Sequence, residues 1–118
     1  MTGRRQAIGA AAEAAVAGWY EARGWIVVAR NWRGTAGEID LVVRREGTVV
    51  ICEVKARSSD AYGAPVEAVG AAKRRRLRLL AGEFLAAHPQ PGCSARIDVA
   101  AVRPGGSTPR IEVIEGAC

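Results

Sequence analysis

Four charged side chains occur in a stretch that otherwise reads as two buried strands. Residues 37–57, GEIDLVVRREGTVVICEVKAR, form two apolar runs around a tight turn, and the runs contain Glu38, Asp40, Glu53 and Lys55. Charged groups are costly to bury unless they are paired with opposite charges or bind a metal ion. The stretch therefore indicates a functional site carried by a hairpin.

The register of the hairpin decides which of these charges meet. We place the turn at Glu46-Gly47, and antiparallel pairing from that turn sets Asp40 opposite Glu53. The same register sets Glu38 opposite Lys55. Because alternate residues of a strand share a face, these four side chains project to one side. The other side is predicted to hold apolar residues: Ile39, Leu41, Cys52 and Val54.

Opposed carboxylates in this register repel each other. Their Cβ atoms would stand about 5 Å apart, and like charges at that separation repel by roughly 3 kcal/mol at an effective dielectric of about 20. Lys55 offsets part of this repulsion, and a divalent cation offsets more, with oxygen ligands suiting Mg²⁺ or Mn²⁺. Asp40 and Glu53 are therefore candidate metal ligands.

Hydrolysis of a phosphodiester needs such a set of groups. A metal ion neutralises the phosphate oxygens and acidifies the attacking water, and a cation orients that water or stabilises the growing negative charge. Lys55 is the candidate for the cation. The alternative reading is a ladder of salt bridges on the exposed face of an edge hairpin.

Composition indicates a globular protein and favours an acidic partner. Its 118 residues fit a single domain, residues 1–118, and 49% of them are hydrophobic and 25% charged. A net charge of +5 favours nucleic acid as the partner, although a membrane surface or solubility alone would also suit it. The only lysines are Lys55 and Lys73, in a chain that otherwise uses arginine.

Cysteine usage indicates a reducing compartment. Cys52, Cys93 and Cys118 are odd in number and lack C-x-x-C spacing, and His88 is the only histidine. This pattern argues against a disulfide framework or a zinc site and favours the cytoplasm. The alanine-rich start resembles a signal peptide, but Gln6 and Glu13 interrupt it, so we interpret it as a first helix; no segment is long enough to span a membrane.

Hydrophobic periodicity predicts an α/β fold. The order is α-β-β-β-α-β-β, which predicts a mixed sheet flanked by helices. The second helix is expected to be interrupted near Gly70. The predicted helices span residues 4–23 and 66–88, and the predicted strands span residues 25–29, 38–44, 48–56, 95–102 and 111–114, with a turn at 34–37.

The run G-E-I-D-L-V, followed after a short turn by V-I-C-E-V-K-A-R, resembles the YraN family of small bacterial proteins. The likeness extends to G-A-A-A-E, R-N-W-R, K-R-R-R-L and R-I-D-V, and so covers nearly the whole chain. The family is assigned to the PD-(D/E)XK, or restriction-endonuclease-like, superfamily and is similar to archaeal Holliday junction resolvases. The resemblance implies a metal-dependent nuclease acting on DNA, branched DNA included, with Asp40, Glu53 and Lys55 as the catalytic core and Glu13 as a further ligand to Mg²⁺ or Mn²⁺.

The remaining candidates would bind nucleic acid. Lys73 lies within the apolar stripe of the second helix, where it either contacts a phosphate or extends along the helix to solvent. Arg74 belongs to a cluster with Arg75, Arg76 and Arg78, which either is a solvated face or grips phosphates.

Two further pairs flank the hairpin strands. Arg57 and Ser58 directly follow the motif and would contact a phosphate, or simply end a strand. Arg33 precedes the first strand of the hairpin and stands beside Trp32, whose indole either stacks on an unpaired base or, as we favour for all three tryptophans, packs in the core.

Three functions are consistent with the sequence. The first is a nuclease; the second is a catalytically silent nucleic-acid-binding module of the same fold; the third is a protein-interaction adaptor with a basic surface. DNA is favoured over RNA as the partner. The sequence leaves monomer and homodimer open, although a resolvase-like enzyme would need two active sites.

Overall fold

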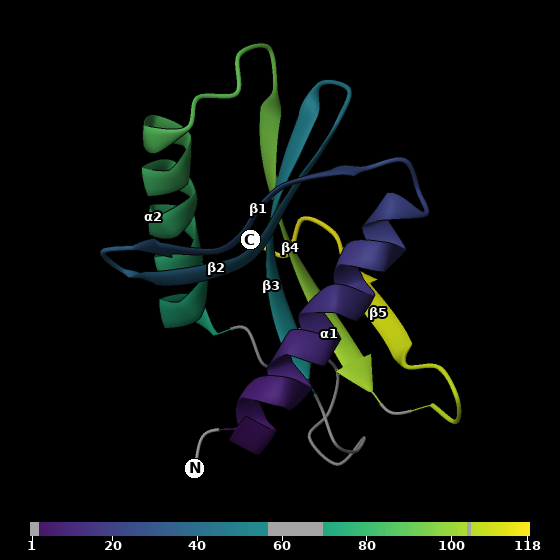
Figure 1. The fold of residues 1–118 in the computed structure, drawn as a ribbon. Helices are drawn as coiled ribbons and strands as arrows, with labels where there is room; N and C mark the ends of the chain where they lie inside the picture. Colours follow the sequence, from purple (N-terminus) through teal and green to yellow (C-terminus); the bar gives the residue numbers. More distant parts are fainter. Residues whose placement is uncertain (1–2, 57–69, 104) are drawn as a thin grey trace.

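The computed structural model describes residues 3–56, 70–103 and 105–118 (Figure 1). It confirms the predicted order of two helices and five strands. The elements are α1 (Gly3–Glu21), β1 (Ile26–Gly34), β2 (Gly37–Arg45), β3 (Thr48–Ala56), α2 (Ala71–Ala87), β4 (Ser94–Arg103) and β5 (Arg110–Ile114). Within these residues, neither helix is both long enough and apolar enough to cross a membrane.

The five strands form one mixed sheet, as predicted. Their order in the sheet follows the chain, β1-β2-β3-β4-β5, and every neighbouring pair is antiparallel except β3 and β4. Parallel neighbours need a crossover connection, and α2 lies in the segment that joins these two strands. The sheet therefore consists of three antiparallel strands, β1-β2-β3, joined through a parallel crossover to the antiparallel pair β4-β5.

The helices cover opposite faces of the sheet (Figure 1). The α1 face buries the helix residues Ala12, Val16 and Tyr20 against Leu41 and Cys52 of the hairpin. The other face buries a second set of apolar side chains, which includes Ile39, Val42, Ile51, Leu77, Leu80 and Phe84. Both faces of the central strands are thus covered, which explains why β2 and β3 read as continuous apolar runs.

The first strand is longer and less regular than the sequence predicts. It runs to Gly34 rather than ending at Ala29, and its pairing with β2 shifts register between Val27 and Ala29. Asn31 has a positive φ of 50°. A bulge adds a residue that has no partner, so it is invisible to a period-two pattern.

The irregular part of the hairpin places one apolar residue on the opposite face from the prediction. Ile39 packs against α2, whereas Leu41 packs against α1. The two would share a face in a regular strand. β2 separates from β3 between these two residues, because the backbone pairing of the two strands begins only at Leu41. The end of the β1/β2 hairpin beyond this point packs against α2.

Glu83 of α2 holds the tip of that hairpin. Its carboxylate accepts hydrogen bonds from the Thr35 hydroxyl at 2.6 Å, from the Thr35 backbone N–H at 3.1 Å and from the Ala36 N–H at 3.4 Å. These hydrogen bonds lower the pKa of Glu83. A Cβ at Gly34 would lie 2.7 Å from the carboxylate, so a larger residue there would displace the Glu83 side chain from the hairpin tip.

The second helix begins at Ala71, directly after Gly70 in an extended conformation. The interruption predicted at Gly70 therefore marks the start of the described helix. The predicted first turns of this helix, from residue 66, lie outside the described residues, as do Arg57 and Ser58.

Candidate active site

The predicted hairpin register is confirmed from Arg45 to Leu41, where the β2/β3 ladder stops. The next residue of β2, Asp40, uses its side chain instead: its Oδ2 accepts a hydrogen bond from the Val54 backbone N–H at 2.8 Å. A carboxylate therefore takes the place of a strand carbonyl at this point. The two strands separate here, and side chains from both faces of the sheet can reach the opening.

Asp40 is the centre of the acidic cluster. Burial raises its pKa from 3.8 to about 6, the hydrogen bond from the Val54 N–H opposes that rise, and the negative charges of Glu53, Glu13 and Glu38 add to it. The predicted proximity of Asp40 and Glu53 is thus present, although the two residues are not a backbone ladder pair. The burial of Asp40 and the negative charges near it therefore outweigh the hydrogen bond that stabilises its ionised form.

Glu13 reaches the cluster from α1. Burial raises its pKa, a hydrogen bond with the Asn31 side chain opposes the rise, and the charge of Glu38 adds to it. The negative charge of Glu13 in turn contributes to the raised pKa of Asp40. Glu13 of α1 and Asn31 of β1 therefore lie near Asp40, at the residue of β2 that follows the end of the β2/β3 ladder. The resemblance had implied that Glu13 belongs to the site.

Two lysines adjoin the cluster at Glu53. The Lys73 Nζ lies 3.5 Å from the Glu53 Oε2, and these side chains are only 17% and 15% exposed. Burial lowers the pKa of Lys73, the neighbouring Lys55 ammonium lowers it further, and the charge of Glu53 opposes the change. Lys73 thus points to the sheet rather than to solvent, and it lies close to Lys55, the only other lysine of the chain.

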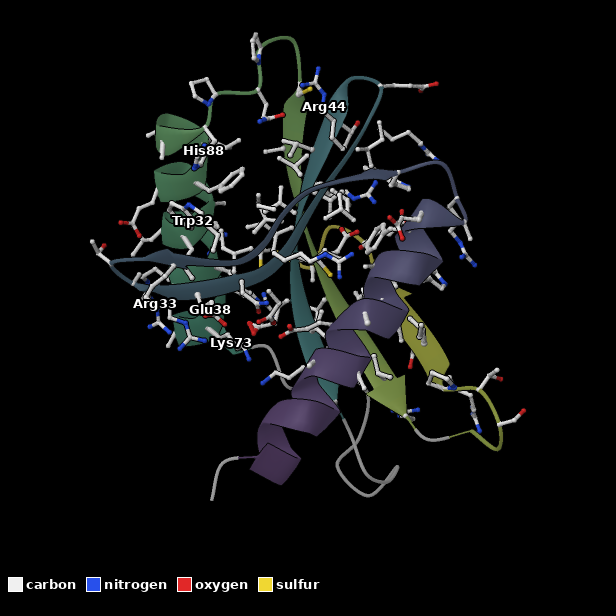
Figure 2. The ribbon with its side chains drawn as sticks, viewed as in Figure 1. Trp32, Arg33, Glu38, Arg44, Lys73 and His88 are labelled. Carbon is white, nitrogen blue, oxygen red and sulfur yellow. The ribbon has the colours of Figure 1, made fainter. Side chains whose placement is uncertain are left out.

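Glu38 has a different partner from the one predicted. It pairs with Arg33 across β1 and β2, at 3.5 Å between Nη2 and Oε2, and does not form a ladder pair with Lys55. The separation of β2 from β3 is the reason. Figure 2 shows Arg33 and Glu38 on the hairpin and Lys73 at the start of α2. Arg33 is 79% exposed and stands at the rim.

The remaining predicted contacts divide between the surface and the core. Arg74 is on the exposed side of α2, together with Arg75, Arg76 and Arg78. Trp32 packs edge-on against Phe84, with ring centroids 5.3 Å apart, which confirms the core interpretation for this indole.

The donor chemistry of the cluster suits a hard divalent cation, because Asp40, Glu53 and Glu13 offer carboxylate oxygens. Among the described residues, no three His, Cys, Asp or Glu side chains stand together in an arrangement ready to hold a metal ion. Glu53 is instead directed to Lys73. A cation at Asp40 would have to draw Glu53 away from this ammonium.

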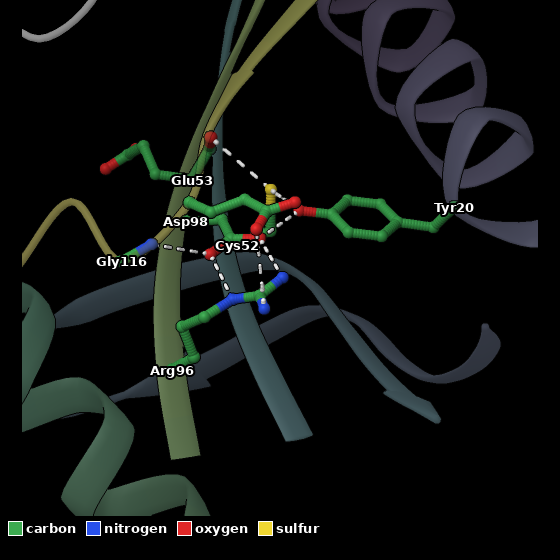
Figure 3. Close-up of polar contacts among 7 residues, drawn as sticks. Tyr20, Cys52, Glu53, Arg96, Asp98 and Gly116 are labelled. Carbon is green, nitrogen blue, oxygen red and sulfur yellow. Dashed lines mark hydrogen bonds and ion pairs between the residues drawn. The ribbon is translucent and has the colours of Figure 1, made fainter. Parts of the chain in front are cut away.

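A second polar cluster lies in the core directly behind the site, and the sequence did not predict its extent. Asp98 of β4 is completely buried. Its carboxylate accepts hydrogen bonds from the Tyr20 hydroxyl at 2.6 Å, from Arg96 Nε at 2.9 Å and from the Gly116 N–H at 3.1 Å (Figure 3). The R-I-D spacing, which puts Arg96 and Asp98 on one face of a strand, was the available signal.

Known proteins match this chain over most of its length. The family described as "Uncharacterised protein family UPF0102" matches residues 12–102. A UPF0102 protein of Clavibacter michiganensis is 47% identical over 116 residues, which cover 98% of each chain. A UPF0102 protein of Beutenbergia cavernae is 48% identical over 113 residues, covering 95% of this chain and 96% of the relative.

These matches include every element of the candidate site. The matched range begins at Ala12 within α1 and ends at Val102 within β4. A UPF0102 protein of Gloeobacter violaceus is 48% identical as well, over 97% of this chain and 94% of its own. The chain belongs to the UPF0102 family, also called YraN, of the PD-(D/E)XK superfamily.

Proposed function

We propose that this protein is a metal-dependent nuclease that hydrolyses phosphodiester bonds of DNA. The observation that carries the proposal is the environment of Asp40, a half-buried carboxylate whose pKa is raised to about 6 by burial and by the negative charges of Glu53, Glu13 and Glu38. Carboxylates with a strongly raised pKa are concentrated at functional sites. Mg²⁺ or Mn²⁺ is the cofactor that these oxygen donors suit.

Each residue of the site has a role in this proposal. Asp40, Glu53 and Glu13 would hold the metal ion, which when bound would supply Lewis-acid chemistry at the phosphate. Lys55 would orient the attacking water and stabilise the charge that grows on the phosphate oxygens. Lys73 neutralises Glu53 in the structure and would contact a substrate phosphate once Glu53 turns away.

The basic surface next to the site would bind the DNA backbone. Arg33 lies at the rim of the site, and Arg74 directly follows Lys73 on α2. Arg57 and Ser58 follow Lys55 in the chain and would extend this surface, as the sequence predicts. Phosphate contacts of this kind position a duplex without reading its sequence.

Cleavage assays with separate variants test the proposal. Purified protein is incubated with labelled duplex, single-stranded, flap and four-way-junction DNA and with RNA, in Mg²⁺, in Mn²⁺ and in EDTA. We expect metal-dependent cleavage that is lost in Asp40→Asn and in Lys55→Ala and kept in Glu46→Gln. Glu46 is a matched control, because it lies at the opposite end of the same hairpin. Cleavage that survives Asp40→Asn would refute the proposal.

A silent nucleic-acid-binding module is the second candidate. The contact between Lys73 and Glu53 favours it, because an ammonium already neutralises one of the expected metal ligands. In that case all variants bind DNA in a salt-dependent manner and none cleaves it. The same panel therefore separates the two functions.

The number of chains that act together depends on the DNA substrate. We propose that cleavage of a four-way junction would use a homodimer, because two strands must be cut and each chain has one candidate site. Sedimentation of the protein with and without junction DNA measures this. A monomer bound to the junction would limit the activity to single cuts.

A further inference from the structure

Apolar packing alone does not fix α1 along its own axis. The side chains that α1 buries against the sheet include the small residues Ala12, Val16 and Ala17. Contacts between small apolar groups are not directional, so they resist separation of the helix from the sheet more than a shift along it. A directional contact elsewhere on the helix therefore adds a restraint on the position of Glu13 beside Asp40.

Tyr20 makes that contact. Its hydroxyl donates a hydrogen bond of 2.6 Å to the Asp98 Oδ2 and lies 3.7 Å from the Cys52 Sγ (Figure 3). Tyr20 follows Glu13 by seven residues, which is nearly two helical turns, or about 10 Å along the axis. The two side chains consequently lie on the same face of α1.

The acceptor of this hydrogen bond is itself held in place. Arg96 donates to both oxygens of Asp98, at 2.9 and 3.1 Å, and the Gly116 N–H donates at 3.1 Å. Asp98 is 0% exposed. A carboxylate with this many donors cannot follow a displaced tyrosine without losing other hydrogen bonds, so it acts as a fixed point.

That fixed point lies directly behind the opening of the ladder. Asp98 is the ladder partner of Cys52 in β4 and β3, and Cys52 is the ladder partner of Leu41 in β3 and β2. Glu53 and Asp40 are the next residues along their strands. The tyrosine is therefore anchored to the same backbone that carries the two hairpin carboxylates.

We propose that Tyr20 is a positioning residue whose hydroxyl, held by Asp98, sets the position of α1 along the sheet and so keeps the Glu13 carboxylate beside Asp40. The inference rests on the proposed function only for its effect on catalysis. The placement of Glu13 is a separate property of the fold.

Tyr20→Phe tests the proposal because it removes one oxygen and keeps the ring, whose edge contacts with Trp19 and Trp25 have centroids 5.0 and 5.7 Å apart. Proton NMR on the metal-free protein monitors the nuclear Overhauser contact between the Asn31 side-chain amide and the Glu13 side chain. We expect this contact to be lost in Tyr20→Phe. It should remain in Phe84→Leu, a control that perturbs the core on the other face of the sheet.

A double-mutant cycle gives the catalytic readout. We expect Tyr20→Phe to slow cleavage about tenfold, and to add less than about twofold in a Glu13→Gln background, because the two changes act through one group. A folded Tyr20→Phe variant that keeps the Asn31–Glu13 contact would overturn the proposal, as would additive effects in the cycle. If the wild type does not cleave, the proposed function fails, and the NMR contact still decides the positioning role.

Discussion

Asp98 and Asp40 lie on the two strands that flank β3, yet their surroundings are opposite. Asp98 is fully buried and receives hydrogen bonds from Tyr20, Arg96 and Gly116. Asp40 receives a backbone hydrogen bond from Val54 and is surrounded by the negative charges of other carboxylates. The better buried of the two is therefore the better compensated.

The contrast separates two uses of a carboxylate. Where donors and a guanidinium satisfy the charge, removing the carboxylate leaves its partners unpaired and costs stability. Where like charges gather, removing one carboxylate relieves repulsion, and the cost falls on function. Asp98 is the first case, and we infer that Asp40 is the second.

The largest effect is expected from Asp98→Ala. Removal of the carboxylate leaves Arg96 and the Tyr20 hydroxyl without their buried partner, and the free energy of unfolding should fall by about 3 to 5 kcal/mol. Urea denaturation followed by circular dichroism measures it. A loss below about 1 kcal/mol would mean that Asp98 is no better compensated than a surface carboxylate.

The next largest effect is expected on catalysis at the site of Asp40. Lys55→Ala should slow DNA cleavage by at least about 100-fold, because it removes the cation that stabilises the developing charge. DNA affinity, measured by fluorescence anisotropy, should change by less than about threefold, since one contact among many phosphate contacts is lost. A parallel loss of binding and cleavage would make Lys55 a binding residue instead.

A smaller effect is expected on metal affinity, because Lys73 and a metal ion would compete for Glu53. Lys73→Met removes the ammonium that competes with a cation for this carboxylate. Mn²⁺ affinity, measured by isothermal titration calorimetry, should rise on the order of tenfold, about 1.4 kcal/mol. Arg75→Met is the matched control, because Arg75 is exposed on the same helix. Unchanged or weaker Mn²⁺ binding in Lys73→Met would contradict the competition.

The smallest effect is expected on the pH dependence of the free energy of unfolding. Because the pKa of Asp40 is raised in the folded state to about 6, the folded protein binds a proton more tightly than the unfolded chain. Stability from this group is lost as the pH rises from about 4 to about 6. Asp40→Asn, whose amide oxygen can still accept from Val54, should therefore be more stable than wild type at pH 8.

The expected gain is about 1 kcal/mol after allowance for the partial exposure of the group, and it should vanish near pH 4. Thermal unfolding at pH 4, 6 and 8 measures it. A variant less stable than wild type at pH 8 would show that Asp40 is compensated like Asp98.

The regular parts of the fold could be predicted from the sequence. The turn at Glu46-Gly47 and the apolar alternation fixed the register from Leu41 to Arg45, and the structure confirms it. Short apolar strands separated by turn residues and a helical repeat also predicted the element order. These features depend on local signals, which one sequence contains.

The exceptions depend on contacts between distant residues. The change of face at Ile39 and the pairing of Glu38 with Arg33 follow from the separation of β2 and β3, and the bulge in β1 is a separate irregularity of its pairing with β2. The contact of Glu83 with Thr35 joins residues 48 positions apart. No local pattern predicts such contacts, and the hydrogen bonds of Asp98 were missed for the same reason.

The hydrogen bond from the Val54 N–H to Asp40 has a consequence for observing the site. An amide that donates to an ionisable side chain has a proton chemical shift and a solvent-exchange rate that depend on the charge of its acceptor. In this chain that acceptor is the carboxylate proposed to bind the cation. A single backbone resonance, Val54, would therefore report whether Asp40 is protonated, ionised or bound to metal, without a label and without a substrate.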